Sequence, residues 1–584
     1  CAKFCVYNQF HFLAGKNKEK SMMVIKELVN LYEALVEQGK VAPMGWTDSK
    51  VTYGLELDKN GIPKGLKPLA VREVESKKGK RIEAIPAYVM VPEQKKRTNG
   101  VNPYLLCDTA GYLLGVSKNG KDAIKYFNAS KKNHLKFLKG LSCDAASAVI
   151  KFFQQWNPDS FSCYDFLLEK ENELATVKIV FLYNGEPVSS DKEIVERWQE
   201  LYESQYNKEE KITCIITGKK EPQARNHKNI MNIANGASMG QPLVSNDKQA
   251  FWSYNREKAD GIGIGMYTAH AYTTALNYLL KDHKHVVKLG KITAVGWLEG
   301  GDPAEEKIFE VFQNAADVWT EKNEKINMER KFFLLGLSPN SGRLVVNFFL
   351  ENSFGNFLSN VNDFRKDFFI ELPEYVDTDK EIPLWRILKQ TLPPGSKEVA
   401  VTERLPLEML TAIYNKQRYP ESLINGVMKR IHAEQKVSYE KAAIIKGYYT
   451  RNGQCPREVL GVDLNEECED IPYILGRIFA VCEHLQEKAI PGVKSTITMR
   501  FFNTAYMVPA RVYPTLLKMS SWHLKKLKKD AERIYFDSML SDLLNKIEGK
   551  FPQQLTFEQQ GCFMLGYYFQ RQKRFSKRKV DKDE

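Results

Sequence analysis

The hydrophobic pattern of this 584-residue chain changes at a proline-rich stretch, Glu371–Gly395. Before it, strand-like segments are mixed with segments of helical spacing; they alternate as in Val51–Asp58 or are continuously apolar as in Lys331–Leu337. After it, the apolar residues of every segment recur at helical spacing. Strands do not alternate regularly with long crossover helices, so we predict an α+β fold rather than a doubly wound one. A mixed N-terminal sheet-and-helix body is expected to precede an all-α C-terminal helical bundle.

The N-terminal part contains strand and helix patterns in an irregular order. Strands are predicted at Val51–Asp58, Leu66–Val74, Ala87–Val91, Leu174–Tyr183, Lys211–Thr217 and Lys291–Leu298, with a hairpin at Lys331–Leu337 and Arg343–Leu350. Helices are predicted at Val24–Gly39, Lys121–Trp156, Asp191–Gln205, Thr268–Leu280 and Phe354–Phe369. A sharper amphipathic pattern starts only at Met22 or Met23, so we expect residues 1–22 to be an extra segment without a functional role.

The C-terminal part contains only helix patterns, separated by short turns. Helices are predicted at Pro406–Tyr414, Glu421–Gln435, Glu440–Thr450, Ile471–Ala489, Thr496–Lys529, Arg533–Ile547 and Glu558–Arg571. Pro, Gly and Asn turns between the last four indicate an antiparallel bundle. We therefore expect six parts: the extra segment (1–22), an α+β domain (23–205), a second α+β portion with a long polar loop (206–372), a helical linker region (373–454), a four-helix bundle (455–572) and a basic tail (573–584).

Charge and cysteine usage narrow the class of protein. The net charge of +13 favours a polyanionic partner. None of the ten cysteines forms a CxxC pair, so neither a zinc ribbon nor a disulfide scaffold is supported, and reduced cytosolic thiols are expected. No apolar run reaches the roughly 18 residues that would indicate a membrane span.

A basic, amide-rich loop follows the predicted strand at Ala87–Val91. Three cations lead into a turn with Gly and Asn, which permit tight backbone turns, while amide side chains both donate and accept hydrogen bonds. Such a loop could hold phosphates with its cations while an Asn reads a base edge. The alternative is a surface turn with a solvated basic flank. The candidate residues are Lys95, Lys96, Arg97, Thr98, Asn99, Gly100 and Asn102.

A second, longer polar loop follows the predicted strand Lys211–Thr217. It mixes cations with amides and aromatic residues, a combination that suits single-stranded or distorted nucleic acid through charge and stacking. Loops of this length are usually functional or disordered. Its candidate contact residues are Lys219, Lys220, Arg225, His227, Lys228, Asn246 and Trp252.

Motifs that could indicate catalysis or a bound ion fail on spacing. Gly261–Gly265 lacks the lysine and the GxGxxG pattern of phosphate-binding loops. His270, His283 and His285 do not form an HExxH frame, and the long loop holds no GxSxG. Asp108 has no second carboxylate close in sequence, so a hydrogen-bond anchor is favoured there over a catalytic acid. We therefore predict no catalytic residue, no metal and no cofactor.

The segment Thr496–Lys529 combines an apolar stripe with a dense basic face, and breaks are expected at Pro509 and Pro514. The stripe comprises Leu516, Leu517, Met519, Trp522, Leu524 and Leu527. A helix of this kind packs on one side and can meet a polyanion on the other, although an ordinary solvated helix has the same pattern. Phe501 and Phe502 are expected to pack in the core. The candidate basic residues are Arg500, Lys518, Lys525, Lys526, Lys528 and Lys529.

An ordered set of passages from about Met23 to Gln570 resembles the large subunit of the type I-C CRISPR Cascade surveillance complex. The passages are VTYGLELD, KRTNGVNPYLLCDTAGYLLG, CIITG…ARNH…GAS…LVSND…AFWSY, AYTTALNYLL, DIPYILGRIFAVCEHLQEKA and TITMRFFNTAYMVPARVYPTLLKMSSWHLKKL. No single passage is diagnostic, but the ordered set is.

The resemblance implies a non-catalytic role in RNA-guided antiviral defence, in the prokaryotic cytoplasm and away from membranes. Such a subunit sits at the 5′-handle end of the crRNA, recognises a short PAM on double-stranded DNA, helps to open the duplex, stabilises the R-loop with its displaced strand and supports recruitment of a helicase-nuclease. Its expected partners include the Cascade backbone and 5′-handle-binding subunits. Small subunits that resemble its C-terminal region can arise from an internal start, here at Met428 or near Val459–Val462.

Within that role, the Lys95–Asn102 loop is our best candidate for the PAM contact, and the lysine face of the bundle for tracking a DNA strand. Two other functions stay open. The first is a nucleic-acid-processing nuclease, and the second is a purely structural ribonucleoprotein scaffold that touches only protein and crRNA.

Overall fold

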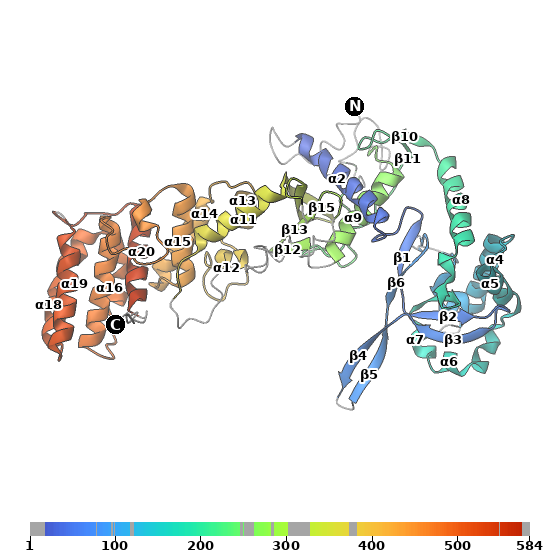
Figure 1. Ribbon diagram of the computed structural model, residues 1–584, viewed down its shortest axis with the longest axis horizontal. Coiled ribbons are helices and arrows are strands. Elements are labelled where there is room, and N and C mark those ends of the chain that lie inside the picture. Colours follow the sequence, from blue (N-terminus) through green and yellow to red (C-terminus); the bar gives the residue numbers. More distant parts are fainter. Residues whose placement is uncertain are drawn as a thin grey trace, which may run out of the picture. The chain divides into compact units, whose positions relative to one another are not determined.

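The computed structural model (Figure 1) describes residues 18–76, 79–94, 97, 100–116, 122–245, 249, 262–281, 285–301, 327–372, 382–547 and 549–574. The chain divides into two compact units. The first unit holds residues 1–228 and 245–276, and the second unit holds residues 229–244 and 277–584. Both units contain strands and helices. The described residues from 382 onward contain helices and connecting loops but no strands. This confirms the predicted α+β fold with an all-α C-terminal region.

A five-stranded sheet organises the first unit. Its strands are β2 (Tyr53–Leu57), β3 (Pro63–Pro68), β7 (Cys107–Thr109), β8 (Lys178–Tyr183) and β9 (Glu186–Pro187). The order is β3-β2-β8-β7, and β9 pairs with β8. The central pair β2 and β8 is parallel, whereas the other pairs are antiparallel. A parallel pair needs a long crossover connection, and the chain between β2 and β8 supplies it with helices.

Two of these crossover helices, α4 (Ala123–Leu138) and α5 (Asp144–Gln155), pack against the sheet. The ring of Phe152 in α5 lies 5.2 Å from that of Phe181 in β8, centroid to centroid. His134 of α4 contacts the same Phe181 ring edge-on. The core of the first unit is therefore built between this helix pair and the central parallel strands.

Two predicted elements of the first unit are divided in the structure. The single helix expected at Lys121–Trp156 becomes α4 and α5, because Gly140 takes a φ of +85° that ends the first helix. The single strand expected at Leu66–Val74 becomes β3 and β4, because the chain changes its pairing partner at Leu69. The Leu69 N–H still donates to the Thr52 carbonyl, in register with the Tyr53–Pro68 pair of β2 and β3, and from Ala70 on the chain pairs with β5.

Two antiparallel ribbons stand beside the five-stranded sheet. β1 (Trp46–Val51) pairs with β6 (Ala87–Pro92), and β4 (Ala70–Ser76) pairs with β5 (Gly79–Ile85). Figure 1 shows the β4–β5 ribbon extending away from the sheet. The other described elements of this part are α2 (Lys18–Glu37), α3 (Ala110–Leu113), η2 (Pro158–Cys163), α6 (Asp165–Leu168), α7 (Glu171–Leu174), η3 (Val188–Ser190), α8 (Lys192–Lys208), β10 (Lys211–Thr213), β11 (Lys220–Pro222) and α9 (Met266–Lys281).

The second unit begins with an antiparallel sheet and continues with helices. The sheet runs in chain order through β12 (Val286–Leu289), β13 (Ile292–Leu298), β14 (Lys331–Asn340) and β15 (Arg343–Ser353). The helices are α11 (Phe354–Phe368), α12 (Leu384–Lys389), α13 (Leu405–Tyr414), α14 (Glu421–Glu434), α15 (Tyr439–Asn452), η8 (Arg457–Val459), α16 (Ile471–Ala489), α17 (Ile497–Met507), α18 (Pro509–Lys526), α19 (Asp530–Asn545) and α20 (Phe557–Lys573).

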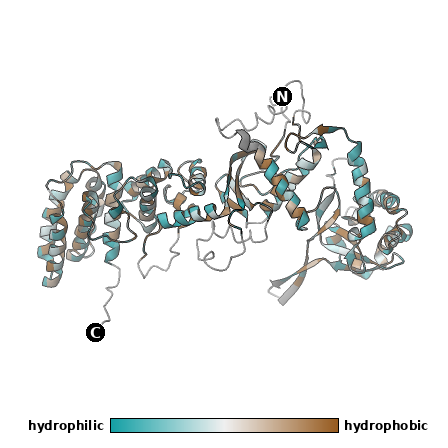
Figure 2. Ribbon diagram, turned by 45° about the horizontal axis from the view of Figure 1, so that its top comes forward, coloured by the Kyte–Doolittle hydropathy of each residue, from teal (hydrophilic) through white to brown (hydrophobic). Residues whose placement is uncertain are grey.

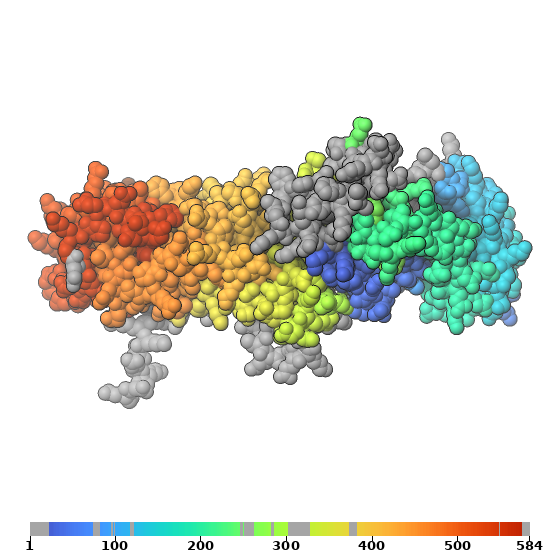
Figure 3. All heavy atoms as spheres, turned by 90° about the horizontal axis from the view of Figure 1, so that it is seen from above, coloured from blue at the N-terminus to red at the C-terminus, as the bar shows by residue number. Residues whose placement is uncertain are grey.

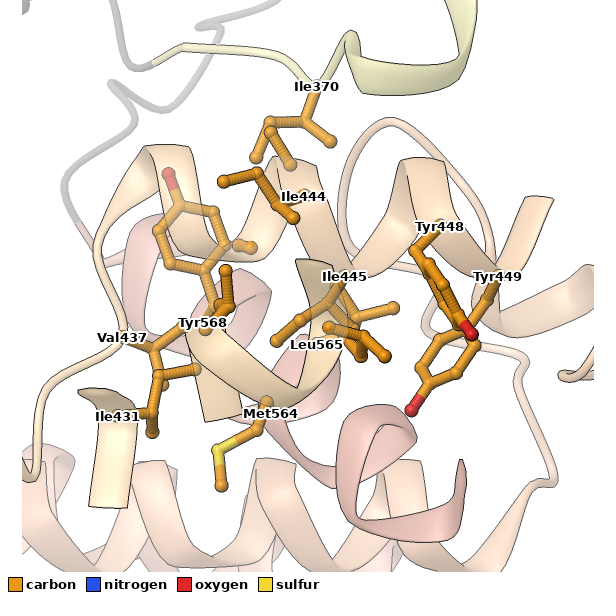
Figure 4. Close-up of a cluster of buried hydrophobic side chains, with 14 of the residues drawn as sticks. Ile370, Ile431, Val437, Ile444, Ile445, Tyr448, Tyr449, Met564, Leu565 and Tyr568 are labelled. Atoms are coloured by element: carbon orange, nitrogen blue, oxygen red, sulfur yellow. The ribbon is translucent and has the colours of Figure 1, made fainter. Parts of the chain in front are cut away.

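One hydrophobic core runs through the second unit, from the sheet into the C-terminal helices. Figure 4 shows a part of it, where Ile445 of α15 lies beside Leu565 of α20, with Tyr449 to one side of this pair and Met564 to the other. In Figure 2 each C-terminal helix carries both hydrophobic and hydrophilic residues, as expected of amphipathic helices that pack side by side. In Figure 3 the orange and red atoms of the C-terminal residues lie next to each other on the face shown.

The C-terminal helices follow the predicted pattern with one difference. α16 has the predicted bounds, and its N-cap Asp470 accepts the N–H of Tyr473. The chain breaks at Val508, as expected before Pro509, but α18 continues through Pro514, where a second break was predicted. The described residues between 455 and 572 thus form five α-helices. Pro514 removes one helical hydrogen bond, while the neighbouring Tyr513 is fully buried and donates from its hydroxyl to the Leu475 carbonyl at 2.6 Å.

Candidate nucleic-acid interface

Three separate basic regions are candidates for contacting nucleic acid, two in the first unit and one in the second. In the loop after β6, Arg97, Gly100 and Asn102 are described, whereas Lys95, Lys96, Thr98 and Asn99 lie outside the described residues. Gly100 takes a φ of +82°, and Asn102 is exposed. The part of the loop that can be described is thus a glycine turn followed by an exposed amide.

Arg97 is held inside the loop. Its guanidinium carbon lies 3.8 Å from the ring centroid of Tyr104 and 4.0 Å from that of Tyr112. Its Nε–H donates to the Asn102 carbonyl at 2.7 Å, and its terminal nitrogen pairs with the Asp108 carboxylate. These contacts engage Nε and one terminal nitrogen of the guanidinium, so Arg97 closes the loop on itself. The phosphate contact that the sequence suggested for this side chain stays a prediction, beside the positioning role that these contacts show.

Asp108 is the buried end of this arrangement. Its side chain is fully buried; Oδ2 accepts the N–H of Tyr104 and Oδ1 accepts the N–H of Thr109, both at 2.8 Å. Burial raises the pKa of the Asp108 carboxyl, although Arg97 and the backbone donors act in the opposite direction. The prediction of a hydrogen-bond anchor at Asp108 is therefore confirmed.

A second anchor holds the end of the loop just before β7. Leu106 has a φ of +62°, which is strained for a residue with a side chain. Its N–H donates to Nε2 of His134 at 2.8 Å, while Nδ1–H of His134 donates to the Ser130 carbonyl at 2.8 Å. His134 is fully buried and stacks on Phe153, with ring centroids 4.6 Å apart. Both ring nitrogens of His134 therefore have a hydrogen-bond partner when the imidazole is neutral.

His134 gives the first unit a predictable acid sensitivity. Burial lowers the pKa of His134 to about 4 from an ordinary value of 6.5. The unfolded chain takes up the proton first, so this contribution to stability is complete above pH 6.5 and is lost as the pH falls toward 4. We expect the free energy of unfolding to drop by about 2 kcal/mol between pH 7 and pH 5 through His134.

Denaturant titrations at the two pH values measure this drop. In His134→Gln the amide has no proton to gain, so the difference between pH 7 and pH 5 should shrink by about that amount. An unchanged pH difference in His134→Gln would contradict the role of this histidine.

The second basic region surrounds β11. Lys219, Lys220, Arg225 and Lys228 are exposed, whereas His227 is half-buried. Asn246 and Trp252 lie outside the described residues. Lys219, Lys220 and Arg225 are thus placed to meet solvent. The Lys228 ammonium instead lies 3.3 Å from Nδ1 of buried His270, and burial lowers the pKa of Lys228.

His227 and the glycine-rich segment of this region have internal roles. His227 Nδ1 lies 2.6 Å from the Tyr272 hydroxyl, and burial lowers the pKa of His227 to about 4. Glu221 is buried and accepts the N–H and the hydroxyl of Thr268 at 3.0 and 2.9 Å. A Cβ at Gly265 would stand 2.2 Å from the Glu221 carboxylate, so this glycine permits a close approach within the protein.

The third region is the face of α17 and α18 in the second unit. The six predicted cations, Arg500, Lys518, Lys525, Lys526, Lys528 and Lys529, are all exposed. Leu516 and Leu527 of the predicted stripe are buried, and so is Phe502, as expected. Trp522 was placed on the packing stripe by the sequence, but its side chain is 64 % exposed and lies on the basic face.

The misplacement of Trp522 follows from helical geometry. The buried residues of α18 around it are Leu516, Ser520 and His523, with Leu527 following the helix, and they define a narrow stripe. At 100° per residue Trp522 stands about 120° away from Leu516. Comparing the angular positions of the apolar residues around the helix axis would have placed Trp522 outside the packing stripe. In contrast, no sequence signal pairs Arg97 with Tyr104, Tyr112 and Asp108 across an irregular loop.

The described residues contain neither a cluster of metal ligands nor a membrane-spanning helix. No group of three or more His, Cys, Asp or Glu side chains there could hold a metal ion. None of the helices there is long and apolar enough to cross a membrane.

Comparison with known proteins adds one finding to this geometry. The family model described as CRISPR-associated protein (Cas_Csd1) matches residues 28–575. A search of curated proteins found no match. The matched residues include all three basic regions.

Proposed function

The chain belongs to the CRISPR-associated Cas_Csd1 family, and we propose that it is the non-catalytic large subunit of a type I-C crRNA-guided complex. Family membership implies assembly with crRNA and other Cas proteins. The finer proposal is that this subunit recognises the PAM on double-stranded DNA, helps to open the target, stabilises the R-loop and supports recruitment of a helicase-nuclease.

The doubly anchored loop after β6 carries this proposal. Arg97 closes the loop over buried Asp108, and His134 fixes the strained backbone at Leu106. A loop held at these points can present exposed Asn102 in a defined place, as base-edge recognition requires. In RNA-guided recognition the protein reads only a short duplex motif and leaves the rest of the sequence to base pairing.

The basic face of α17 and α18 supports the R-loop part of the proposal. Lys518, Lys525, Lys526 and Lys528 have no carboxylate partner among the described residues, so their charge is available to phosphates. A strand held in this way loses affinity as salt rises, because binding releases condensed counterions.

The helix boundaries favour one of the two internal starts considered for a small subunit. Met428 lies inside α14, so a product that begins there would carry a partial helix. A start near Val459–Val462 falls at or just after the end of η8, before α16, and would keep α16 to α20 whole. We propose that a small subunit, where it is made from this chain, begins near Val459–Val462.

Gel shifts with the assembled complex test the PAM proposal. Lys95→Glu with Lys96→Glu should weaken binding to duplexes with and without the PAM by similar factors, on the order of tenfold each. Asn99→Ala or Asn102→Ala should instead narrow the difference between the two duplexes, by roughly five- to a hundred-fold. Arg97 stays unchanged in these variants, because its substitution would disturb the loop itself.

Lys132→Glu with Lys136→Glu, on the exposed side of α4, is the matched control. Unchanged target binding in the Lys95/Lys96 variant would favour the structural scaffold. Metal-dependent DNA cleavage by the isolated chain, lost on substitution of one acidic cluster, would replace the proposal with a nuclease.

A further inference from the structure

An exposed aromatic ring stands among the lysines of α18. Trp522 is 64 % exposed, and the ammonium of Lys526 lies 4.6 Å from its ring centroid. Lys518 precedes the tryptophan by one helical turn and Lys525 follows it by nearly one turn, so both lie on the same side of the helix. Figure 1 shows α18 and α19 at the edge of the row of C-terminal helices.

The charge around this ring is not neutralised by the protein. α18 contains no acidic residue, and no ion pair of Lys518, Lys525 or Lys526 occurs in the part of the chain described. Other cations of the same helical region are paired: Arg533 with Asp530 at 2.7 Å, and Arg574 with Glu487 at 2.7 Å. The face of α18 therefore offers a positive surface that is complementary to an anion from outside the chain.

We propose that Trp522 stacks on an unpaired base of single-stranded nucleic acid while Lys518, Lys525 and Lys526 bind the flanking phosphates. This inference rests on the proposed function, in which the basic face holds a DNA strand, and it assigns that strand as single and its base contact as Trp522. A tryptophan ring stacks on any base, so the contact needs no sequence preference.

The exposed Trp522 ring favours a single strand over a duplex as the ligand of this face. A duplex presents phosphates to a lysine face, but its bases are stacked inside and offer no face to an aromatic side chain. An unpaired strand presents both groups, and charge together with aromatic stacking is the usual way of binding it. Burying the ring against a base also removes apolar surface from water.

Fluorescence anisotropy with two labelled oligonucleotides tests the proposal on the full chain. One is a 20-nucleotide dT strand, and the other has the same phosphates but abasic sugars. We expect Trp522→Ala to weaken dT binding by roughly five- to a hundred-fold and to leave abasic binding unchanged. Trp522→Phe should retain part of the dT affinity. Lys518→Glu with Lys525→Glu should weaken binding of both oligonucleotides. It should also reduce the steepness of log K against log salt concentration by about 1.4, because two phosphate contacts are lost.

Trp385→Ala is the matched control, because Trp385 of α12 is 54 % exposed and has no place in the proposed site. It should leave both affinities unchanged. An equal loss on dT and abasic strands in Trp522→Ala would overturn the stacking contact. If Trp522→Ala kept full affinity and the lysine variant lost affinity, the stacking contact would also be overturned. The basic face would then remain a nucleic-acid surface.

Two other results would also reject the stacking site. If neither variant changed binding, the basic face itself would be rejected as a nucleic-acid surface. If Trp522→Ala kept full dT affinity and instead impaired assembly with other Cas proteins, the ring would be a protein contact.

Discussion

Replacing Arg97 with alanine is expected to destabilise the first unit by about 3 kcal/mol. The substitution leaves Asp108 buried with two backbone donors but without its cation. It also removes the planar group that lies between the rings of Tyr104 and Tyr112, so part of the loss is packing. Denaturant unfolding followed by circular dichroism measures the change.

The pH dependence of this loss separates the buried charge from simple loss of packing. Without Arg97 the pKa of Asp108 rises further, because burial already raises it. A folded carboxyl with a raised pKa holds its proton longer than the unfolded chain does, so its penalty grows as the pH rises above about 4. The difference between Arg97→Ala and the unmodified protein should therefore be largest near neutral pH and shrink in acid.

Three further variants complete the test. Arg97→Lys keeps the charge but not the planar fork, and should recover only part of the stability. Arg97→Ala with Asp108→Asn should recover part of it as well, because a neutral amide needs no cation. Arg72→Ala breaks the exposed pair with Glu83 (3.7 Å) and should change stability by less than about 0.5 kcal/mol. A loss in Arg97→Ala as small as this control would contradict the anchoring role.

The loop shows where sequence reasoning stops. Its composition predicts polar contacts and tight turns, and Asp108 could be assigned as an anchor from its isolation among carboxylates. The sequence could not predict which cation pairs with Asp108, because Lys95, Lys96 and Arg97 have the same formal charge. Only the folded geometry selects Arg97, through the two tyrosine rings that fit a planar guanidinium. The remaining cations of the loop keep their predicted role as a proposal.

Helices were predicted best where apolar spacing and an N-cap agree. α16 begins after Asp470 and ends at Ala489, as its pattern indicates. The predictions failed where one residue redirects the backbone, as Gly140 does between α4 and α5. They also failed where packing overrides a local preference, as at Pro514 in α18. Periodicity reports the average face of a helix and is insensitive to such single positions.

The crossing of α16 and α20 is a further feature that periodicity does not reveal. Gly476 of α16 faces the backbone of α20, where an added Cβ would stand 2.1 Å from the Phe563 carbonyl oxygen and 2.7 Å from the Tyr567 nitrogen. Gly566 of α20 faces α16 in return, where its Cβ would stand 2.1 Å from the Tyr473 carbonyl oxygen. Both contacts are with backbone atoms, which cannot rotate away as a side chain can. At these two glycines the helices therefore meet backbone to backbone, with no side chain between them.

Gly476→Ala and Gly566→Ala are each expected to destabilise the second unit by about 2–3 kcal/mol. Alanine favours an isolated helix over glycine by about 1 kcal/mol, so any net loss must come from the forced separation of the two helices. The expected drop in melting temperature is about 5 °C for each variant, measured by differential scanning fluorimetry.

The double variant distinguishes this crossing from two independent defects. Once the first methyl group has pushed the helices apart, the second meets more space, so the two losses should add to less than their sum. Gly461→Ala is the matched control, because its Cβ would meet nothing closer than the Asp463 oxygen at 3.4 Å. It should melt within about 1 °C of the unmodified protein. If Gly476→Ala and Gly566→Ala melted like this control, α16 and α20 could not meet backbone to backbone, and the pairing that closes the C-terminal core would have to differ from the one described.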